Sequence, residues 1–169
     1  MDLDCLATQM ALNAERIRAL CQGISEEQSR WKPGPDSWSI LEVVNHLYDE
    51  EREDFRARLD HVLHRVGQPW PAIDPQGWVT ARKYNDRELG VSLARFLAER
   101  KESLGWLRTL SAPNWAAVYE APWGPIAAGD VMASWVAHDL LHMRQLVKLH
   151  YLFTTAQLKP HDVRYAGAW

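Results

Sequence analysis

Apolar residues recur along this chain with the spacing of buried helix faces. In four long segments they return every three or four residues, which places them on one side of an α-helix. We therefore expect helices at about 3–22, 39–65, 86–110 and 129–150. No segment alternates apolar and polar residues convincingly enough to predict a strand. The pattern predicts an all-α protein, and four such helices favour a four-helix bundle.

Local signals mark where the helices begin and end. Ser39 and Glu42 have the spacing of a capping box, and Asp86 is a suitable N-cap for the third helix. Gly23 follows the first helix, where glycine often ends one. The apolar stripe of the second helix is expected to continue to Val66 at its end.

Two long connections separate the helices, at 67–84 and 111–128, and both are rich in proline. Their length favours a bundle with long crossover loops over a simple up-and-down arrangement. The first connection contains Trp70 and Trp78, so it either covers a site or is a strap that two tryptophans hold down. We expect one domain over 1–169, with 151–169 as a C-terminal tail.

The composition excludes several classes of partner. The 169 residues carry a formal net charge of -3, and lysine and arginine are scattered rather than clustered, so we expect no nucleic acid. No apolar stretch is long enough to span a bilayer, and the start of the chain lacks the features of a signal peptide. These observations predict no membrane association and a cytoplasmic location.

The two cysteines and the nine tryptophans add little to this picture. Cys5 and Cys21 fall on one predicted helix, where 16 residues correspond to about 24 Å, too far for a disulfide. We therefore expect two reduced thiols. Tryptophan usually lines cores, pockets or interfaces.

The charged residues in the middle of the second helix, from Glu50 to Asp54, are most simply a solvated face, with a functional role as the alternative. Asp49 and Glu50 follow His46 by three and four residues, so either could contact its ring, although a solvated position is the simpler expectation for both. The remaining histidines are expected on the surface or in the tail: His61, His64, His150 and His161.

Three histidines are candidates for a metal site. His138 and His142 are four residues apart, which stacks their rings on one face of the fourth helix. His46 adjoins the apolar stripe of the second helix and can face inward. Three nitrogen ligands with a remaining open position are typical of a catalytic metal, and zinc, nickel or iron(II) would accept them.

Other interpretations of these histidines remain open. The string from His138 to His142 is similar to the zinc-protease motif, in which Asp139 would be the general base, but aspartate reaches less far than glutamate and a third ligand would have to come from His150 or His161. A di-iron site would need Glu-x-x-His motifs that are absent. The histidines could also only satisfy one another, or hold a metal without turnover.

Two motifs resemble those of a known family. Pro33-Gly34 precedes Trp38-Ser39-Ile40, and His46 follows eight residues after the tryptophan. The second motif is His138-Asp139-x-x-His142-x-x-Gln145, in which Gln145 could orient a ligand or simply face a neighbouring helix. Together they resemble the DinB-like superfamily, which includes the YfiT-like metal-dependent hydrolases, over about residues 3–150.

The resemblance implies a four-helix bundle, often a homodimer, with one divalent metal on His46, His138 and His142. Relatives include transferases and isomerases that use a low-molecular-weight thiol, so the resemblance implies a small-molecule substrate and either hydrolysis or thiol-dependent transfer. It assigns no catalytic residue, and we keep Asp139 and Glu50 as candidates. One departure is Ala127-Ala128 at the start of the fourth helix, where serine or threonine is common.

Overall fold

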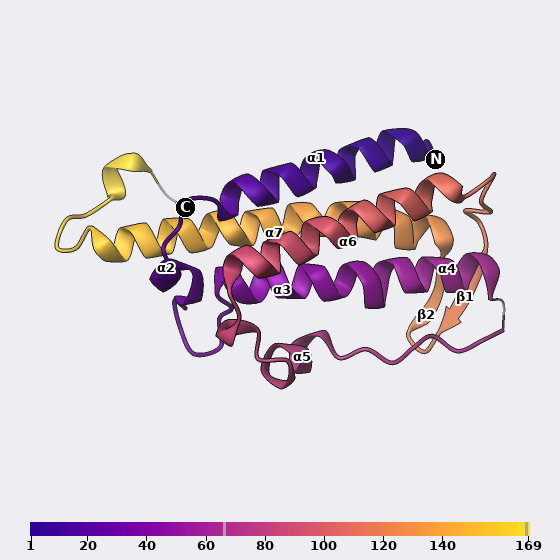
Figure 1. Ribbon diagram of the computed structural model, residues 1–169, viewed down its shortest axis with the longest axis horizontal. Coiled ribbons are helices and arrows are strands. Elements are labelled where there is room, and N and C mark those ends of the chain that lie inside the picture. The colour runs from indigo at the N-terminus through magenta and orange to yellow at the C-terminus, as the bar shows by residue number, and fades with distance from the viewer. Residues whose placement is uncertain (66, 168) are drawn as a thin grey trace.

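The computed structural model describes residues 1–65, 67–167 and 169, so Val66 lies outside the described residues. Four long helical segments form the body of the molecule, and Figure 1 shows how they are arranged. The second segment is continuous but changes its winding, from α-helix to a π-helical stretch and back. The segments are α1 (Leu3–Cys21), α3 (Ile40–Asp49) with η1 (Glu50–Phe55) and α4 (Arg56–His64), α6 (Leu89–Thr109) and α7 (Ala128–Gln157).

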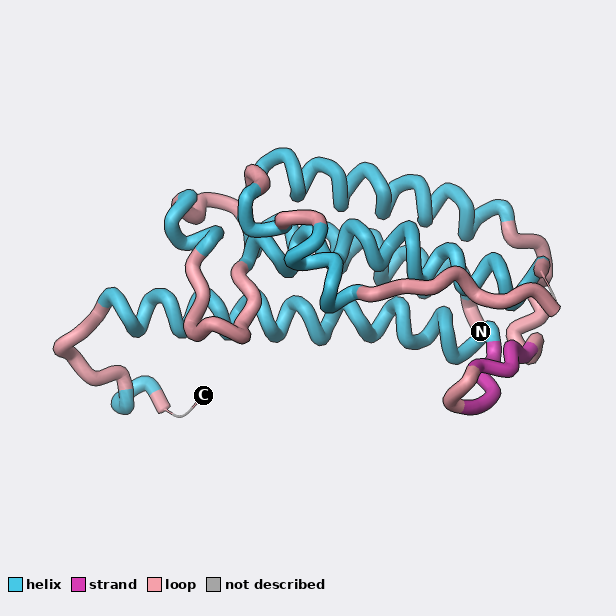
Figure 2. The backbone as a smooth tube through the Cα atoms, turned by 90° about the horizontal axis from the view of Figure 1, so that it is seen from below, coloured by secondary structure: helices cyan, strands magenta, loops and turns pink. Residues whose placement is uncertain are grey.

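The order of these segments confirms a four-helix bundle with a crossover. In Figure 1, α1 and α7 run in one direction, and α3–α4 and α6 run in the opposite one. Both α1 and α3 pack against α6 and α7, so α1 and α3 lie diagonally opposite each other. Since α4 and α6 are parallel, the chain must return along the bundle between them. Residues 67–74 make this return on the outside, as Figure 2 shows.

Short elements occupy the two long connections, which the sequence predicted as loops. The second connection contains a hairpin of β1 (Val118–Ala121) and β2 (Gly124–Ala127), paired antiparallel. The prediction that the chain contains no strands was therefore wrong. Each strand has four residues, which are too few to show alternation in the sequence. The remaining short elements are α2 (Glu26–Arg30), α5 (Pro75–Ala81), η2 (Tyr84–Asp86) and η3 (Arg164–Ala166).

Some helix ends were predicted correctly and others were not. The capping box is confirmed, since Ser39 Oγ accepts from Glu42 N at 3.1 Å and Glu42 Oε2 accepts from Ser39 N at 2.8 Å. The prediction for Asp86 was wrong: it ends η2, and α6 begins three residues later after Glu88, which forms no side-chain cap. In sequence, an aspartate that forms a turn, as Asp86 does, is not distinguishable from one that caps a helix.

The fourth helix is longer than expected, because α7 continues to Gln157 and takes the first seven residues of the predicted tail. Phe153 in this extension packs edge-on against Trp31, with ring centroids 5.6 Å apart. At the other end, Asp130 Oδ2 accepts a hydrogen bond from Ala127 N at 3.2 Å. Half of a capping box thus compensates for the missing serine or threonine.

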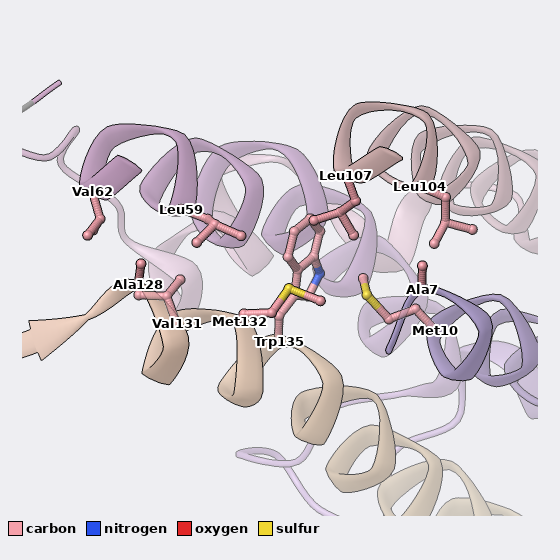
Figure 3. Close-up of a cluster of buried hydrophobic side chains, with 10 residues drawn as sticks. All are labelled: Ala7, Met10, Leu59, Val62, Leu104, Leu107, Ala128, Val131, Met132 and Trp135. Atoms are coloured by element: carbon pink, nitrogen blue, oxygen red, sulfur yellow. The ribbon is translucent and has the colours of Figure 1, made fainter. Parts of the chain in front are cut away.

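The apolar core is divided into two clusters. Figure 3 shows the cluster in which Trp135 is the largest side chain; it lies between the start of α1, α4, the end of α6 and the start of α7. The second cluster fills the other half of the bundle. Its buried members are Ala14, Ile17, Cys21, Ile40, Val43, Val44, Leu47, Phe96, Leu146 and Leu149.

A layer of buried polar side chains is centred on Arg100 of α6, which is 2% exposed. Its guanidinium donates to both oxygens of Glu51 at 2.7 and 2.9 Å, and to both oxygens of Asp139 at 2.8 and 2.7 Å. Asn13 and Trp135 donate to the same carboxylates, at 3.2 and 3.0 Å. The layer therefore joins all four helical segments.

This layer overturns the prediction that the charged run is a solvated face. Glu50, Glu51 and Asp54 are buried, and Arg52 and Glu53 are half-buried. The partner that neutralises Glu51 is on α6, 49 positions away in sequence, so the local pattern gives no indication of it. The run also forms the π-helical stretch, a form that occurs often at functional sites.

Candidate metal centre

The three candidate histidines lie together between two neighbouring helices. His46 comes from α3, and His138 and His142 come from α7, one turn apart. Each offers one ring nitrogen, and these three nitrogens lie within 4.8 Å of one another. His138 Nε2 and His142 Nε2 are 3.0 Å apart. The structure thus brings together the residues that the sequence singled out.

The spacing of the His138–His142 pair and the protonation of all three rings fit a metal ion. Two nitrogens bound to one ion at about 2.0–2.1 Å would lie about 2.9–3.3 Å apart, depending on the angle between the bonds. Burial, and then the neighbouring His142, lowers the pKa of His46 to about 3. Burial and the neighbouring rings lower the pKa of His138 to about 2, and burial also lowers the pKa of His142. Neutral imidazoles have the free lone pair that a metal requires.

Outer contacts hold two of the rings. His142 Nδ1 is 2.8 Å from Gln145 Oε1, which can only accept, so Nδ1 carries the proton and Nε2 is free. Trp38 packs against His46 and Phe55 against His138, with ring centroids 4.8 and 4.9 Å apart. Gln145 therefore contacts one candidate ligand, as an orienting role would require.

Glu50 follows His46 by one helical turn, and its carboxyl group lies near the His46 ring. Its Oε1 is 3.8 Å from His46 Nδ1, too long for a hydrogen bond, and both atoms are buried without a hydrogen-bond partner among the described residues. Burial, and then Asp54, raises the pKa of Glu50 to about 9, and burial also raises the pKa of Asp54. Glu50 is thus a buried carboxylic acid at neutral pH.

The other acidic residues near the motifs have different contacts. Asp139 is buried in the polar layer, where Arg100 contacts both of its oxygens. Asp49 accepts a hydrogen bond from Tyr84 and pairs with Arg82 at 2.6 Å, so it does not contact His46, and its solvated position was predicted wrongly. Arg82 also lies 4.0 Å above the ring of Trp78, which anchors the first connection to the bundle.

The three histidines line a cleft of about 1060 Å³. The segment before α3, which includes Trp38, and α7, with Arg144 and Lys148, both line it. Gln76 of α5 and the terminal Trp169 also line it. The first long connection therefore both crosses the bundle as a strap and contributes to the site.

Sequence reasoning missed most of the cleft wall. Arg144 and Lys148 follow His142 by two and six residues on the same helix, so their place beside the site was detectable from spacing. Gln76 and Trp169 gave no such signal, because each comes from a segment without helical periodicity. Their positions depend on how the crossover and the tail fold back.

The remaining histidines lie outside the cluster. His64 and His161 are exposed, as predicted. The prediction was wrong for His61, which is buried on the inner face of α4, and for His150. The ring of His150 is half-buried and lies 2.6 Å from the Leu20 carbonyl oxygen and 2.9 Å from Gln28, where it links α7 to the end of α1.

Comparisons with known proteins agree with this architecture. The sequence profile of the DinB superfamily matches residues 9–146. The structure is similar to that of YfiT from Bacillus subtilis, with a TM-score of 0.79 and 16% identity, covering 90% of this chain and 87% of that one. YfiT is described as a probable metal-dependent hydrolase with an unusual four-helix bundle topology. Among curated proteins, none matches the chain significantly.

Proposed function

Because this chain belongs to the DinB superfamily, we propose that it is a metal-dependent enzyme in which His46, His138 and His142 hold one divalent ion. The observation that carries the proposal is the convergence of three ring nitrogens within 4.8 Å beside a cleft. Three protein ligands are typical of catalytic rather than structural sites. A divalent ion held in this way supplies Lewis acidity, which activates a water or a thiol.

The surrounding residues would prepare the site rather than react. Gln145 keeps the Nε2 lone pair of His142 free, and Trp38 and Phe55 limit the rotation of the other two rings. Of the two acidic candidates, Asp139 is held by Arg100, which favours a structural role over that of a general base. Glu50 is not among the described residues that line the cleft, so it would act through the neighbouring His46 ring and not touch substrate.

Elemental analysis of the purified protein tests the metal directly. We expect about one zinc, nickel or iron ion per chain, in keeping with a single three-histidine site, and its loss in His138→Ala. His64→Ala is the matched control, because His64 is exposed and lies outside the cluster. The absence of a divalent metal from the wild-type protein, or an unchanged content in His138→Ala, would contradict the proposal.

Hydrolysis of a small molecule is the reaction that we propose first, since the similar protein YfiT is described as a probable hydrolase. Turnover of generic ester or amide substrates by the metal-loaded protein without added thiol would support it. The alternative is a thiol-dependent transferase. In that case a low-molecular-weight thiol should raise the melting temperature, and turnover should require it.

A second candidate function is a non-catalytic metal- or ligand-binding bundle. The pairing of Asp139 and the burial of Glu50 favour it, because Arg100 holds both oxygens of Asp139 and Glu50 is a protonated acid at neutral pH. Bound metal without turnover of any substrate in the panel above would support this candidate. A fourth protein ligand, seen by spectroscopy of the cobalt-substituted protein, would do so as well.

We also propose that the protein is a cytoplasmic homodimer. Leu140 and Val147 are 52% and 40% exposed on the outer face of α7, which supports an apolar contact there. Light scattering should give twice the chain mass of 19.4 kDa, and Leu140→Glu should reduce it. Within the part of the chain that the structure describes, no helix combines the length and apolar character needed to cross a bilayer.

A further inference from the structure

We propose that the cleft beside the three histidines receives an anionic small molecule, whose carboxylate or phosphate group is bound by Arg144 and Lys148. The inference rests on the proposed function, because it names the class of substrate that the metal site would take. Both residues line the cleft together with His138 and His142. All four come from α7, so one rigid helix fixes the cations relative to the candidate metal ligands.

The basic side chains of α7 are confined to the face that lines the cleft. Among the thirty residues of this helix, Arg144 and Lys148 are the only lysine or arginine side chains. They are four residues apart and therefore stack on one face, which is the face that lines the cleft. If their purpose were solubility alone, they could equally occupy the other exposed positions of this long helix.

Neither cation is neutralised by the protein. Throughout residues 1–65, 67–167 and 169, no ion pair or side-chain hydrogen bond involves Arg144 or Lys148. By contrast, the arginines that organise the fold, such as Arg82 and Arg100, contact two carboxylates each. Among the described residues that line the cleft, Asp36 is the only acidic one.

The net charge of the cleft wall is opposite in sign to that of the whole molecule. The chain has a formal net charge of -3, yet two cations face one carboxylate in the cleft. Positive charge concentrated in a concave site attracts anions and raises their local concentration. A divalent ion on the histidines would add to the same field. The shared chemistry of carboxylate and phosphate is therefore what this wall recognises.

The size and polarity of the cleft indicate a metabolite rather than a simple ion. Its volume of about 1060 Å³ is at the upper end of small-molecule pockets, which reach about 1,000 Å³. Trp38 offers an aromatic face for an apolar or planar portion, and the amides of Gln76 and Gln145 offer hydrogen bonds. An anionic end beside Arg144 and Lys148 would leave the rest of the molecule facing the histidines.

Calorimetric titration of the metal-loaded protein with succinate, methyl phosphate and uncharged succinamide tests the inference. We expect one or both anions to bind and succinamide not to bind. The double variant Arg144→Gln/Lys148→Gln should weaken anion binding by about tenfold, the sum of two solvent-exposed charge interactions. Asp36→Asn should tighten it by removing the opposing charge. The stronger of the two anions identifies the group that the cleft prefers.

The matched control is Lys101→Gln/Arg108→Gln, which removes the same charge from exposed positions of α6 and should leave binding unchanged. Any of three outcomes would overturn the inference. The two double variants bind the anions equally, succinamide binds as well as the anions, or neither anion saturates the protein at about 10 mM, the weak limit of small-ligand affinity.

Repeating the titration on chelator-treated protein separates this inference from the proposed function. If anion binding persists without metal and still depends on Arg144 and Lys148, the inference holds even where metal analysis fails. If binding requires the metal and ignores both cations, the anion binds to the metal alone and the inference is overturned while the metal site stands.

Discussion

At His142, a single hydrogen bond determines which ring nitrogen can bind a cation. Gln145 Oε1 accepts from Nδ1 at 2.8 Å, which leaves the lone pair on Nε2, the atom that faces His138. We predict that Gln145→Ala lowers metal affinity by about 10- to 100-fold, the usual effect of losing an outer contact of a ligand. Competition with a coloured chelator measures it. Gln157→Ala on the same helix should have no effect, and an unchanged affinity in Gln145→Ala would exclude an orienting role.

The buried histidines also predict how the metal-free protein responds to acid. His138 has its pKa lowered from 6.5 to about 2 and His46 to about 3, so the unfolded chain takes up protons below pH 6.5 while the folded chain does not. The free energy of unfolding therefore falls as the pH drops through this window. Glu50 contributes with the opposite sign, since its raised pKa of about 9 favours the folded state at low pH and loses that contribution as the pH rises.

Comparison of variants isolates the histidine contribution from that of Glu50. In the presence of a chelator, His138→Gln should lose less stability than the wild type between pH 7 and pH 5, because one proton-binding group of the unfolded chain is gone. His64→Gln, at an exposed position, should follow the wild type. Urea unfolding at both pH values provides the measurement. Parallel losses in His138→Gln and the wild type would mean that His138 is not held neutral in the folded state.

Individual residues also show which parts of the site can be predicted from sequence and which cannot. His46, His138 and His142 were predictable because helical spacing and a family motif both single them out. Glu51 was not, since a glutamate in a charged run looks solvated until Arg100 of another helix is placed beside it. Pairing between distant helices is a tertiary property, and the local pattern of charges contains no record of it.

Among the helices, the Arg100 layer is the strongest specific contact. Arg100→Met would leave the carboxylates of Glu51 and Asp139 buried without their cation. We predict a loss of about 3–5 kcal/mol in the free energy of unfolding, typical of breaking a buried pair from one side. Urea unfolding measures it. Lys101→Met, at the exposed neighbouring position, is the control and should change stability little.

A compensating variant distinguishes lost charge balance from lost packing. In Glu51→Gln/Arg100→Met/Asp139→Asn no charge is left in the layer, so much of the stability should return. If the triple variant is as unstable as Arg100→Met, the shape of the guanidinium rather than its charge holds the layer. Because Asp139 adjoins His138, metal affinity in these variants also shows whether the layer positions that ring.

Element boundaries were less predictable than element existence. The four long helices follow from apolar periodicity, which extends over many residues and tolerates local exceptions. The hairpin, η2 and the last two turns of α7 depend on contacts instead. Phe153 is ordered against Trp31, and Trp70 stacks on Tyr119 of β1 with centroids 4.2 Å apart. Such contacts come from segments far apart in sequence, so they do not appear as a local pattern.

Across the whole molecule, the candidate site lies where two antiparallel helices are neighbours. His46 on α3 and His138 on α7 come from segments that are separated by the crossover strap and by α6. A metal bound by both residues would therefore link α3 to α7. Since the unfolded chain cannot hold these ligands together, metal binding must stabilise the folded state.

We therefore predict that zinc or nickel raises the melting temperature of the chelator-treated protein. At a free metal concentration 100 times the Kd, the stabilisation is about 2.7 kcal/mol, or roughly 5–10 °C for a domain of this size. His46→Ala and His138→Ala should each abolish the shift, although they lie on different helices, whereas His64→Ala should retain it. Differential scanning calorimetry provides the measurement. A shift that survives in His46→Ala would mean that the α7 pair binds metal alone, and that the ion does not join the two halves of the bundle.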